Sequence, residues 1–284
     1  MLCAPAVCCY SDAVQSSRGK GAGLYETIGY EKSGAVAAVA LNRPKLLNAF
    51  NGKLHEEIYA AFEDAEADSE VRAVLLRGEG RGFSAGADLG EIVEKGSENP
   101  DLGEYLRGTY SRLVTKIAGM EKPVVAALHG PVYGAGLGIA LACDLRVAAE
   151  DAKFSVAFIK IGLMPNAGIT YFLPRMIGLS RAFEMSMLGE DIDAEEARRI
   201  GLVSRVVAEG SAASEGASLA DRLSKLPTRA LAQMKSALHE SFDADLPQAL
   251  EREAAGQTAC GYTADHREGV AAFFDKRTPA FTGE

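Results

Sequence analysis

Tryptophan is absent from this chain of 284 residues, and cysteine is scarce beyond the N-terminus. Cys3, Cys8 and Cys9 fall within the first nine residues, whereas Cys143 and Cys260 stand alone in apolar surroundings. This spacing excludes a disulfide framework and a cysteine-based metal site, so we predict that no metal is bound. It favours a reducing compartment. We therefore expect a cytoplasmic location, or an organellar matrix if the start of the chain is a targeting segment.

Long apolar runs and an excess of basic residues are also missing. No run reaches the roughly 20 apolar residues of a membrane helix, and "MLCAPAVCCY" lacks the charged start of a secretory signal. The formal net charge of −9 argues against nucleic acid and anionic membranes as partners. We expect residues 1–22 to form an irregular leader. The remaining composition, 48% hydrophobic overall, is that of an ordinary globular protein.

What the sequence does contain is an alternation of apolar runs and amphipathic segments. Runs at 35–44, 71–80 and 123–130 predict buried strands, and 144–156 predicts a fourth strand and its turn. Between them, apolar residues recur at helical spacing, in one group at Leu54, Ile58, Ala61, Phe62 and Ala65 and in another at Leu106, Tyr110, Leu113 and Ile117. This alternation indicates an α/β fold with largely parallel, buried strands.

After residue 165 the strand signal fades and helical patterns dominate. Asp193 followed by Glu196 resembles a capping box, and it opens a helix that we expect to end at Gly201. Further helical patterns run over 228–254 and 264–276. The Ser/Ala/Gly-rich stretch at 209–218 is the one low-complexity tract of the sequence.

Two glycine-rich turns follow predicted strands. "HGPVYGAGLGIALACD" (129–144) carries Gly134, Gly136 and Gly138, but Ile139 and Leu141 stand where a dinucleotide fingerprint needs its third small residue. The glycines alone are also consistent with tight packing of a helix on a strand. "GRGFSAGADLGE" (80–91) makes a second such turn. Turns at the carboxyl ends of neighbouring parallel strands share one sheet edge, where two backbone amides can bind one developing oxyanion.

Several long segments resemble the enoyl-CoA hydratase/isomerase (crotonase) superfamily. They are "LNRPKLLNAF", "GFSAGADL", "KPVVAALHGPVYGAGLGIALACDLRVAAEDAKF", "IGLMPNAGITYFLPRMIG" and "FFDKRTP", and together they span roughly 24–284. "FSVAFIKIGLMPNAG" is most similar to the branch that contains phenylacetyl-CoA ring-epoxide isomerases and Δ3,Δ2-enoyl-CoA isomerases. The resemblance implies a crotonase-like spiral of ββα units over 23–208. It also implies a helical trimerisation region over 209–284, and hence a homotrimer or a dimer of trimers.

The same resemblance implies an acyl-CoA substrate and no separate cofactor, because coenzyme A arrives as part of the thioester. The thioester oxygen would lie between the amides of Ala87 and Ala135, with Gly134 beside them. Contacts with the substrate would come from Lys45, Leu46, Ala85, Asp88 and Leu89, and Arg81 is a weaker candidate. Phe273 and Lys276 would touch the coenzyme A of a neighbouring subunit. Lysines suit phosphates as point charges, although solvated surface lysines would look the same in the sequence.

The acids of this superfamily are missing. A hydratase moves protons with paired glutamates, and the corresponding positions hold Gly138 and Phe158. The isomerase branch places an aspartate where this chain has Asn166, whose amide orients a group but is no general base. Replacement acids could come from Glu91 or Glu104. Other candidates near the acyl group are the hydroxyls of Tyr133 and Tyr171, although such hydroxyls are often satisfied within a core.

Three hypotheses follow. The leading one is an acyl-CoA-processing enzyme, isomerase or hydratase, that stabilises a thioester enolate in a backbone oxyanion hole. The second is an acyl-CoA-binding member of the family with little or no hydratase activity, because the acid positions are vacant. The third, a dehalogenase-like or hydrolase-like enzyme, lacks a well-placed nucleophilic aspartate. The acyl group is not identified by the sequence, although Phe158, Tyr133 and Tyr171 suggest a bulky or aromatic one.

Overall fold

The computed structural model describes residues 25–94 and 101–284, so the predicted leader at 1–22 lies outside the described residues. A six-stranded sheet forms the centre of the protein, with strand order β1-β2-β3-β4-β6-β9. Its strands are β1 (Ile28–Ser33), β2 (Val36–Leu41), β3 (Ala73–Gly78), β4 (Val124–Leu128), β6 (Leu145–Ala149) and β9 (Arg205–Val207). The apolar runs at 35–44, 71–80 and 123–130 thus form β2, β3 and β4, as predicted.

Strand direction in the large sheet brings the turns of interest to one edge. β1 and β2 are antiparallel, whereas β2, β3, β4, β6 and β9 pair in parallel. The segments that follow β3 and β4 therefore leave the sheet on the same side. There they run beside a smaller sheet of β5 (Pro131–Tyr133), β7 (Lys153–Ser155) and β8 (Ile192–Asp193), in the order β5-β7-β8.

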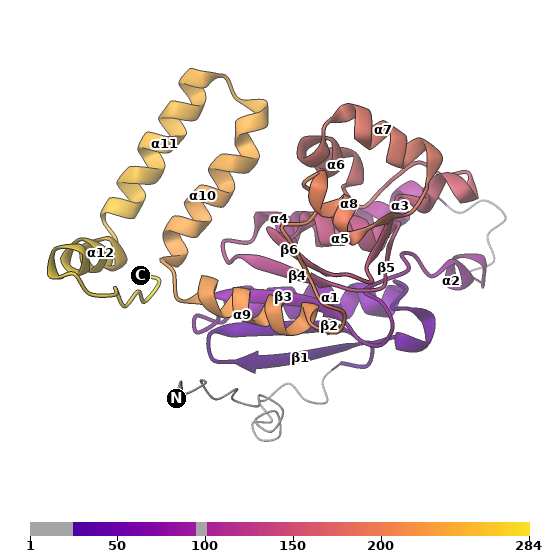
Figure 1. Ribbon diagram of the computed structural model, residues 1–284, viewed down its shortest axis with the longest axis horizontal. Coiled ribbons are helices and arrows are strands. Elements are labelled where there is room, and N and C mark those ends of the chain that lie inside the picture. Colours follow the sequence, from indigo (N-terminus) through magenta and orange to yellow (C-terminus); the bar gives the residue numbers. More distant parts are fainter. Residues whose placement is uncertain (1–24, 95–100) are drawn as a thin grey trace, which may run out of the picture.

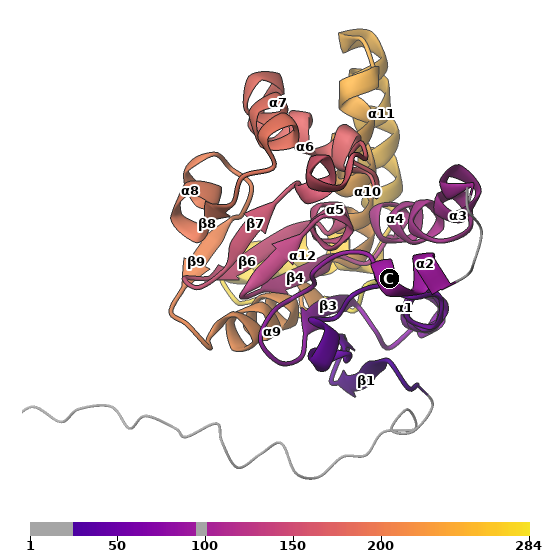
Figure 2. The same cartoon turned by 90° about the vertical axis from the view of Figure 1, so that its right-hand side faces the viewer.

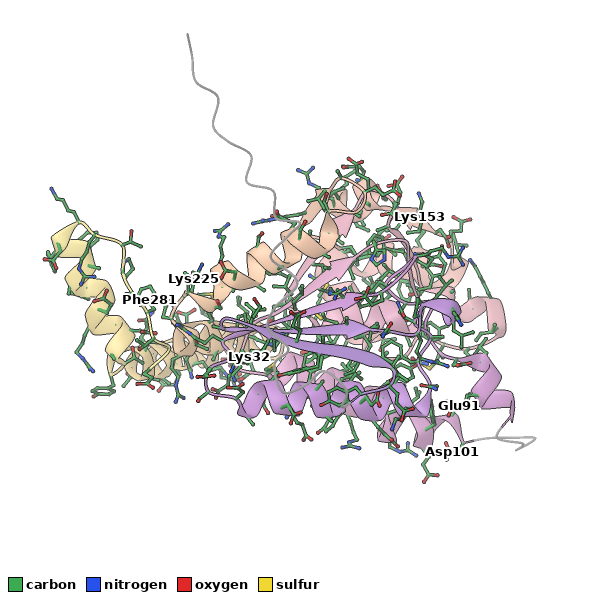
Figure 3. The ribbon with its side chains drawn as sticks, turned by 90° about the horizontal axis from the view of Figure 1, so that it is seen from below. Lys32, Glu91, Asp101, Lys153, Lys225 and Phe281 are labelled. Carbon is green, nitrogen blue, oxygen red and sulfur yellow. The ribbon has the colours of Figure 1, made fainter. Side chains whose placement is uncertain are left out.

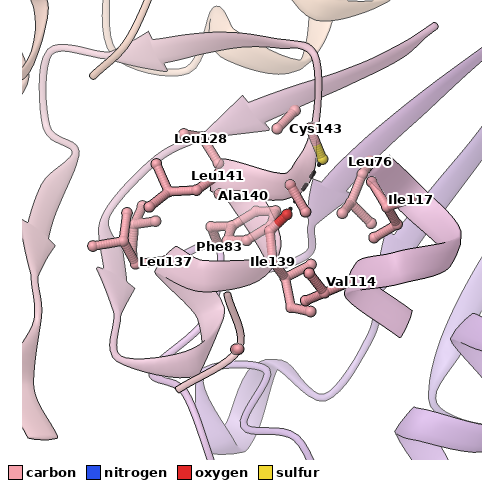
Figure 4. Close-up of a cluster of buried hydrophobic side chains, with 14 of the residues drawn as sticks. Leu76, Phe83, Val114, Ile117, Leu128, Leu137, Ile139, Ala140, Leu141 and Cys143 are labelled. Carbon is pink, nitrogen blue, oxygen red and sulfur yellow. Dashed lines mark hydrogen bonds between the residues drawn. The ribbon is translucent and has the colours of Figure 1, made fainter. Parts of the chain in front are cut away.

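Helices cover both faces of the large sheet (Figures 1 and 2). On one face lie α1 (Gly52–Ala67), α4 (Tyr110–Gly119) and α5 (Ala135–Ala142), packed into the main hydrophobic core. On the other face α9 (Ala212–Ser224) buries Leu219 and Ala220 in a smaller core. Every residue of α5 is buried, and Figure 4 shows its side chains among those of Phe83, Leu128 and Ile117. The start of α5 is thereby fixed in position.

The rest of the chain is mainly helical. α6 (Ile169–Ile177), α7 (Leu179–Leu188) and α8 (Ala194–Arg199) lie beside the smaller sheet. The C-terminal region consists of α10 (Thr228–Glu240), α11 (Leu246–Gly261) and α12 (Ala264–Asp275). Figure 1 shows α10 and α11 side by side as a hairpin that extends away from the sheets. No helix in the described part of the chain is both long and apolar enough to cross a membrane.

Two helices predicted from the sequence are each divided in the structure. The pattern from Leu106 to Ile117 spans α3 (Leu102–Gly108) and α4, because Thr109 leaves the helical region with φ −123° and ψ −91°. The pattern over 228–254 spans α10 and α11, separated by a 3₁₀ turn at Ser241–Asp243. A new cap starts α11, since the Asp245 side chain accepts the Gln248 amide and the Gln248 side chain accepts the Asp245 amide.

Several short elements escaped prediction. β1, β8 and β9 were not expected, and the segment 144–156 forms two strands, β6 and β7, that join different sheets. The Ser/Ala/Gly-rich stretch at 209–218 lies largely within α9. Asp193 does cap α8 by accepting the Glu196 amide at 2.8 Å. The Glu196 carboxylate, however, pairs with Arg181 and Arg199, so half of the predicted capping box forms.

Candidate active site

The two glycine-containing turns are hydrogen-bonded to each other. The Ser84 amide donates to the carbonyl of Pro131 at 3.0 Å, and the Tyr133 amide donates back to the carbonyl of Ser84 at 2.9 Å. These two bonds form a parallel bridge between Ser84 and Val132. The turn after β3 and the turn that leads into α5 are therefore one rigid unit rather than two separate loops.

Glycines allow this close approach. Gly86 has φ +98°, and a Cβ there would lie 3.0 Å from the carbonyl oxygen of Tyr133 and 3.3 Å from the amide nitrogen of Ala135. A Cβ on Gly136 would lie 2.6 Å from Cβ of Ser84. All three distances are shorter than the ordinary contacts of a Cβ atom. Any larger residue at either position would push the turns apart.

This approach brings Ala87 and Ala135 near each other. Phe50 and Ala87 form a parallel bridge, in which the Phe50 amide donates to Gly86 and the Asp88 amide donates to Phe50. The amide of Ala87 consequently points away from Phe50. Ala135 begins α5, at the positive end of the helix dipole. Among the described residues neither of these two amides donates a hydrogen bond, so both are available to an oxygen ligand.

Gly134 shapes the wall beside these amides. Its φ of 52° and ψ of −125° are accessible to glycine and strained for other residues. The Phe158 ring lies 3.8 Å from the position that a Cβ of Gly134 would take. Phe158 belongs to the 3₁₀ helix Ala157–Ile161, and it is buried. The site is therefore aromatic and apolar where a hydratase would have its second glutamate.

The position of the first glutamate has no free space. A Cβ on Gly138 would lie 2.5 Å from the carbonyl oxygen of Ala167 and 2.7 Å from its Cβ. Ala167 itself has φ +51°, so the turn at 165–168 bends sharply toward α5. Asn166, in the same turn, has a buried Oδ1 without a hydrogen-bond partner. The space for an acid at position 138 is thus filled by Ala167, and the unpaired amide oxygen belongs to the residue that precedes Ala167.

The predicted contacts with coenzyme A gather on the surface beside the first turn. Lys45 and Leu46 are exposed in the 3₁₀ helix Pro44–Leu46, and Leu89 is exposed at the start of α2 (Leu89–Glu94). Ala85 is exposed between them, and its amide donates to the carbonyl of Leu47 at 2.8 Å. Arg81 is exposed as well. The structure thus brings these residues to one side of the turn.

Asp88 differs from its neighbours because its carboxylate is already paired. It lies 2.9 Å from the Arg43 guanidinium, and both side chains are largely buried. A buried pair is costly to break, since it would leave one charge uncompensated. We therefore interpret the Asp88 side chain as a support for the turn, which leaves only its backbone to face a ligand.

Phe273 and Lys276 lie at the opposite end of the molecule from α2. Phe273 is exposed in the last turn of α12, and the exposed Lys276 directly follows this helix in a left-handed conformation with φ 54°. Figure 1 shows α12 and α2 at opposite sides, and Figure 3 shows Glu91 and Asp101 far from Phe281. Within one chain these two residues do not join the other site residues, so their contact with a neighbour's ligand stays a prediction.

Four other candidates are occupied elsewhere or exposed. The Tyr133 hydroxyl donates to Asp191 at 2.6 Å, and burial together with this bond raises its pKa to about 12. Glu91 accepts the amide of Gly52 at 2.8 Å, at the start of α1. The remaining two are Glu104, which is exposed, and Tyr171, whose ring lies 3.7 Å below the Arg175 guanidinium. None of these contacts is that of a prepared acid or base.

Asn48 was missed by the sequence analysis although it holds the site together. It is fully buried with φ 54°, and its Nδ2 donates to the carbonyls of Glu79, Gly82 and Phe83. Its Oδ1 accepts the amide of Arg43 at 2.8 Å. A lone asparagine within the apolar stretch "LLNAF" is the signal that was available. No group of three or more potential metal ligands occurs among the described residues.

Comparison with known proteins identifies the family. The model for enoyl-CoA hydratase/isomerase matches residues 31–284. A Rhodobacter capsulatus protein named "Probable enoyl-CoA hydratase" is 42% identical over 91% of this chain and 99% of its own length. The 1,2-epoxyphenylacetyl-CoA isomerase of Escherichia coli is 40% identical over 88% of this chain and 95% of its own.

A solved structure agrees with these relatives. The enoyl-CoA hydratase from Bacillus anthracis superposes with a TM-score of 0.84 at 31% identity, covering 91% of this chain and all of that one. The α/β architecture described above is therefore the crotonase-like fold that the sequence motifs led us to expect. The chain belongs to the enoyl-CoA hydratase/isomerase family of enzymes.

Proposed function

We propose that the protein stabilises the enolate of an acyl-CoA thioester with the backbone amides of Ala87 and Ala135. The observation that carries this proposal is that neither amide has a hydrogen-bond partner among the described residues, and that the close approach of Gly86 to Ala135 holds the two amides near each other. When a proton leaves the carbon next to a thioester, negative charge collects on the carbonyl oxygen. Two fixed donors at that oxygen, one of them at a helix N-terminus, favour this charge over the neutral ground state.

An isomerase-type reaction fits this site better than hydration. Hydration needs paired acids, and backbone or an aromatic ring occupies both of their positions. Movement of a double bond or opening of a ring needs the oxyanion donors and one proton carrier. Asn166 does not act as that carrier, and we assign to its Oδ1 the role of holding the water molecule or substrate group that takes up the proton from the carbon next to the thioester and returns it to the acyl chain.

Substrate binding follows from the surface beside the first turn. Lys45 would face the phosphates of coenzyme A, with Leu46, Ala85 and Leu89 along the pantetheine. No cofactor is needed beyond the coenzyme A of the substrate itself. The same proposal includes a cytoplasmic location and a trimer or dimer of trimers, in which Phe273 and Lys276 reach a neighbour's ligand.

The reaction class can be tested directly. The protein is incubated at high concentration with 3-enoyl-, 2-enoyl- and ring-epoxide acyl-CoA thioesters, and products are followed by mass spectrometry. We expect turnover of the 3-enoyl or ring-epoxide class. If no class turns over, the enzymatic proposal fails, and tight binding by calorimetry would then favour the acyl-CoA-binding hypothesis.

A gain-of-function variant tests the role of Asn166. Asn166→Asp restores a carboxylate at the base position of the isomerase branch, and we expect a higher rate with 3-enoyl-CoA. Asn166→Ala is the matched control, because it removes the amide and adds no base. Unchanged rates in Asn166→Asp with intact substrate binding would show that residue 166 does not face the reacting carbon.

A further inference from the structure

The buried hydroxyl of Ser84 lies between the two turns that carry the proposed oxyanion donors. Ser84 is fully buried in the turn after β3. A Cβ on Gly136 would lie 2.6 Å from Cβ of Ser84 and 2.8 Å from its Oγ, so the Ser84 side chain packs directly against the first turn of α5. Ser84 thus belongs to one donor-bearing turn and contacts the helix that begins the other, at Ala135.

The Ser84 hydroxyl makes two hydrogen bonds with defined directions. It donates to the backbone carbonyl of Asn48 at 2.9 Å, and it accepts the amide of Gly86 at 3.1 Å. A carbonyl oxygen only accepts and an amide only donates, so the single hydroxyl proton is committed to Asn48 and a lone pair to Gly86. The hydroxyl is therefore fully used within the fold.

Asn48 fixes the acceptor end of this arrangement. Its side chain Nδ2 donates to the carbonyls of Gly82 and Phe83 at 2.9 and 3.2 Å, the two residues that precede Ser84. The carbonyl that receives the Ser84 proton is thus tied to the same turn. Hydrogen bonds that share a group in a buried place polarise one another, and the bond to Gly86 is strengthened accordingly.

The two peptide groups of Gly86 determine where the amide of Ala87 points. The Gly86 amide is held by Ser84, and the Gly86 carbonyl accepts the amide of Phe50 at 2.7 Å. The peptide between Gly86 and Ala87 is trans and planar, so the Ala87 amide points opposite to that carbonyl. Gly86 has φ +98° and no side chain to restrict its backbone, and these two bonds supply the restriction instead.

We propose that Ser84 is a positioning residue for the oxyanion site. Its hydroxyl holds the Gly86 amide and thereby fixes the direction of the Ala87 amide toward the thioester oxygen. This inference rests on the proposed function, since it needs Ala87 to be a donor. Ser84 itself touches no reacting atom and transfers no proton. In Ser84→Ala the Gly86 amide loses its acceptor, and the Ala87 donor is no longer held in line with the oxygen. Hydrogen bonds weaken steeply when they are misaligned.

The infrared spectrum of a bound ester tests this role directly. The probe is butyryl-CoA with ¹³C at the thioester carbonyl, a saturated ester with no double bond to move. In the parent protein we expect the amides of Ala87 and Ala135 to lower the carbonyl stretching frequency below its value in water. Ser84→Ala should lose part of that lowering. Its kcat should fall about tenfold with KM nearly unchanged, which is less than the effect of removing a donor outright.

Ser224→Ala is the matched control. Ser224 is also buried, and its hydroxyl donates to the carbonyl of Asp221 at 2.8 Å within α9, on the other face of the large sheet. We expect a small loss of Tm in this variant, with the carbonyl frequency and kcat of the parent. Ser84→Cys keeps a donor and an acceptor in the same place but makes weaker bonds, so its frequency should lie between those of the parent and Ser84→Ala. It provides the test if Ser84→Ala does not fold.

The outcomes separate this inference from the proposed function. A parent protein that does not bind butyryl-CoA, or binds it without lowering the carbonyl frequency, overturns both. A lowered frequency in the parent that is fully retained in Ser84→Ala, or in Ser84→Cys where that is the folded variant, overturns the positioning role alone. Equal losses in Ser84→Ala and Ser224→Ala would trace the effect to general destabilisation, and they would also overturn it.

Discussion

Gly86 controls the distance between the two amide-bearing turns. In Gly86→Ala the new methyl would press on the Tyr133 carbonyl and the Ala135 amide, at 3.0 and 3.3 Å, and move the Ala87 donor away from Ala135. Loss of one oxyanion donor typically lowers kcat about 10²- to 10³-fold, and we expect a decrease of that order. The measurement is kcat and KM with the acyl-CoA thioester that turns over fastest.

Gly34→Ala is the control for Gly86→Ala. Gly34 also has positive φ, at 57°, but nothing lies within 4 Å of its added Cβ, so it carries the backbone strain without the contact. We expect a small loss of stability and an unchanged kcat. A similar loss of kcat in both variants would indicate a general effect of strain, and it would count against an oxyanion role for this turn.

Gly138 gives a second prediction for a single residue. Gly138→Glu restores the first acid of a hydratase in sequence, but its Cβ would lie 2.5 Å from the carbonyl oxygen of Ala167. Overpacking of this kind commonly costs about 1–3 kcal/mol, so we expect a lower Tm. No hydration of 2-enoyl-CoA should appear. A stable variant that hydrates 2-enoyl-CoA would show that the turn at 165–168 moves aside easily.

The sequence allowed the two turns to be predicted, but not what surrounds them. The turns follow from glycine patterns that each lie within a few residues, and the resemblance to the family then implied Ala87 and Ala135 as the donors. The contact of Gly138 with Ala167 joins separate segments, so the pattern alone left an apparent vacancy where backbone is packed. The sequence likewise did not show that the buried polar atoms of His55 and Tyr110 lack a hydrogen-bond partner in the described part of the chain, because such partners come from distant segments.

At the scale of elements, Glu57 attaches the first strand to the first helix. It lies on α1, and its carboxylate accepts the amides of Glu26 and Thr27 and the Thr27 hydroxyl, the last at 2.6 Å. Burial alone would raise its pKa, but these bonds and Lys53 together lower it below the ordinary 4.5. The ionised form is therefore the one that stabilises the fold.

Glu57→Gln should destabilise the protein by about 2 kcal/mol at neutral pH, the usual scale for hydrogen bonds to a charged group. Because the folded pKa is depressed, the contribution is present above the ordinary pKa and is lost as pH falls through the folded pKa. The parent and the variant should thus converge in stability once the pH falls below the folded pKa of Glu57, which is itself below the ordinary value. Urea unfolding at several pH values measures this, with exposed Glu56→Gln as control. A difference that does not change with pH would contradict it.

Element boundaries show where local sequence is informative. The strands β2, β3 and β4 were predicted because each is a continuous apolar run buried on both faces. The divided helices were not, although Gly108 precedes the break at Thr109 and Pro247 follows the cap at Asp245. Apolar residues recur at helical spacing on both sides of each break, so the sequence pattern gave no sign that the helix is interrupted. Short strands such as β9 form because they pair with a neighbouring strand, here β6. A pattern of three residues in the sequence is too short to predict such a pairing.

At the scale of the whole molecule, the C-terminal helices expose more apolar surface than a monomer usually carries. The large exposed side chains of α10–α12 and the turns between them are Met234, Leu238, Phe242, Leu246, Leu250, Tyr262, Val270, Phe273 and Phe274. Figure 1 shows that these helices extend beyond the sheets. Association with further copies of the chain would bury this surface, as the resemblance to the family led us to expect.

We predict a solution mass of three or six times the 30.0 kDa of one chain, measured by light scattering. Phe273 and Phe274 are 79% and 77% exposed, so Phe273→Glu with Phe274→Glu should shift the mass toward the monomer without unfolding the chain. Placing two carboxylates in an apolar interface is costly, because each would lose its hydration without gaining a partner. Ser218→Glu, on the exposed side of α9, controls for added charge. A parent protein that is monomeric at micromolar concentration would contradict the prediction, and Phe273 and Lys276 would then have no neighbouring ligand to contact.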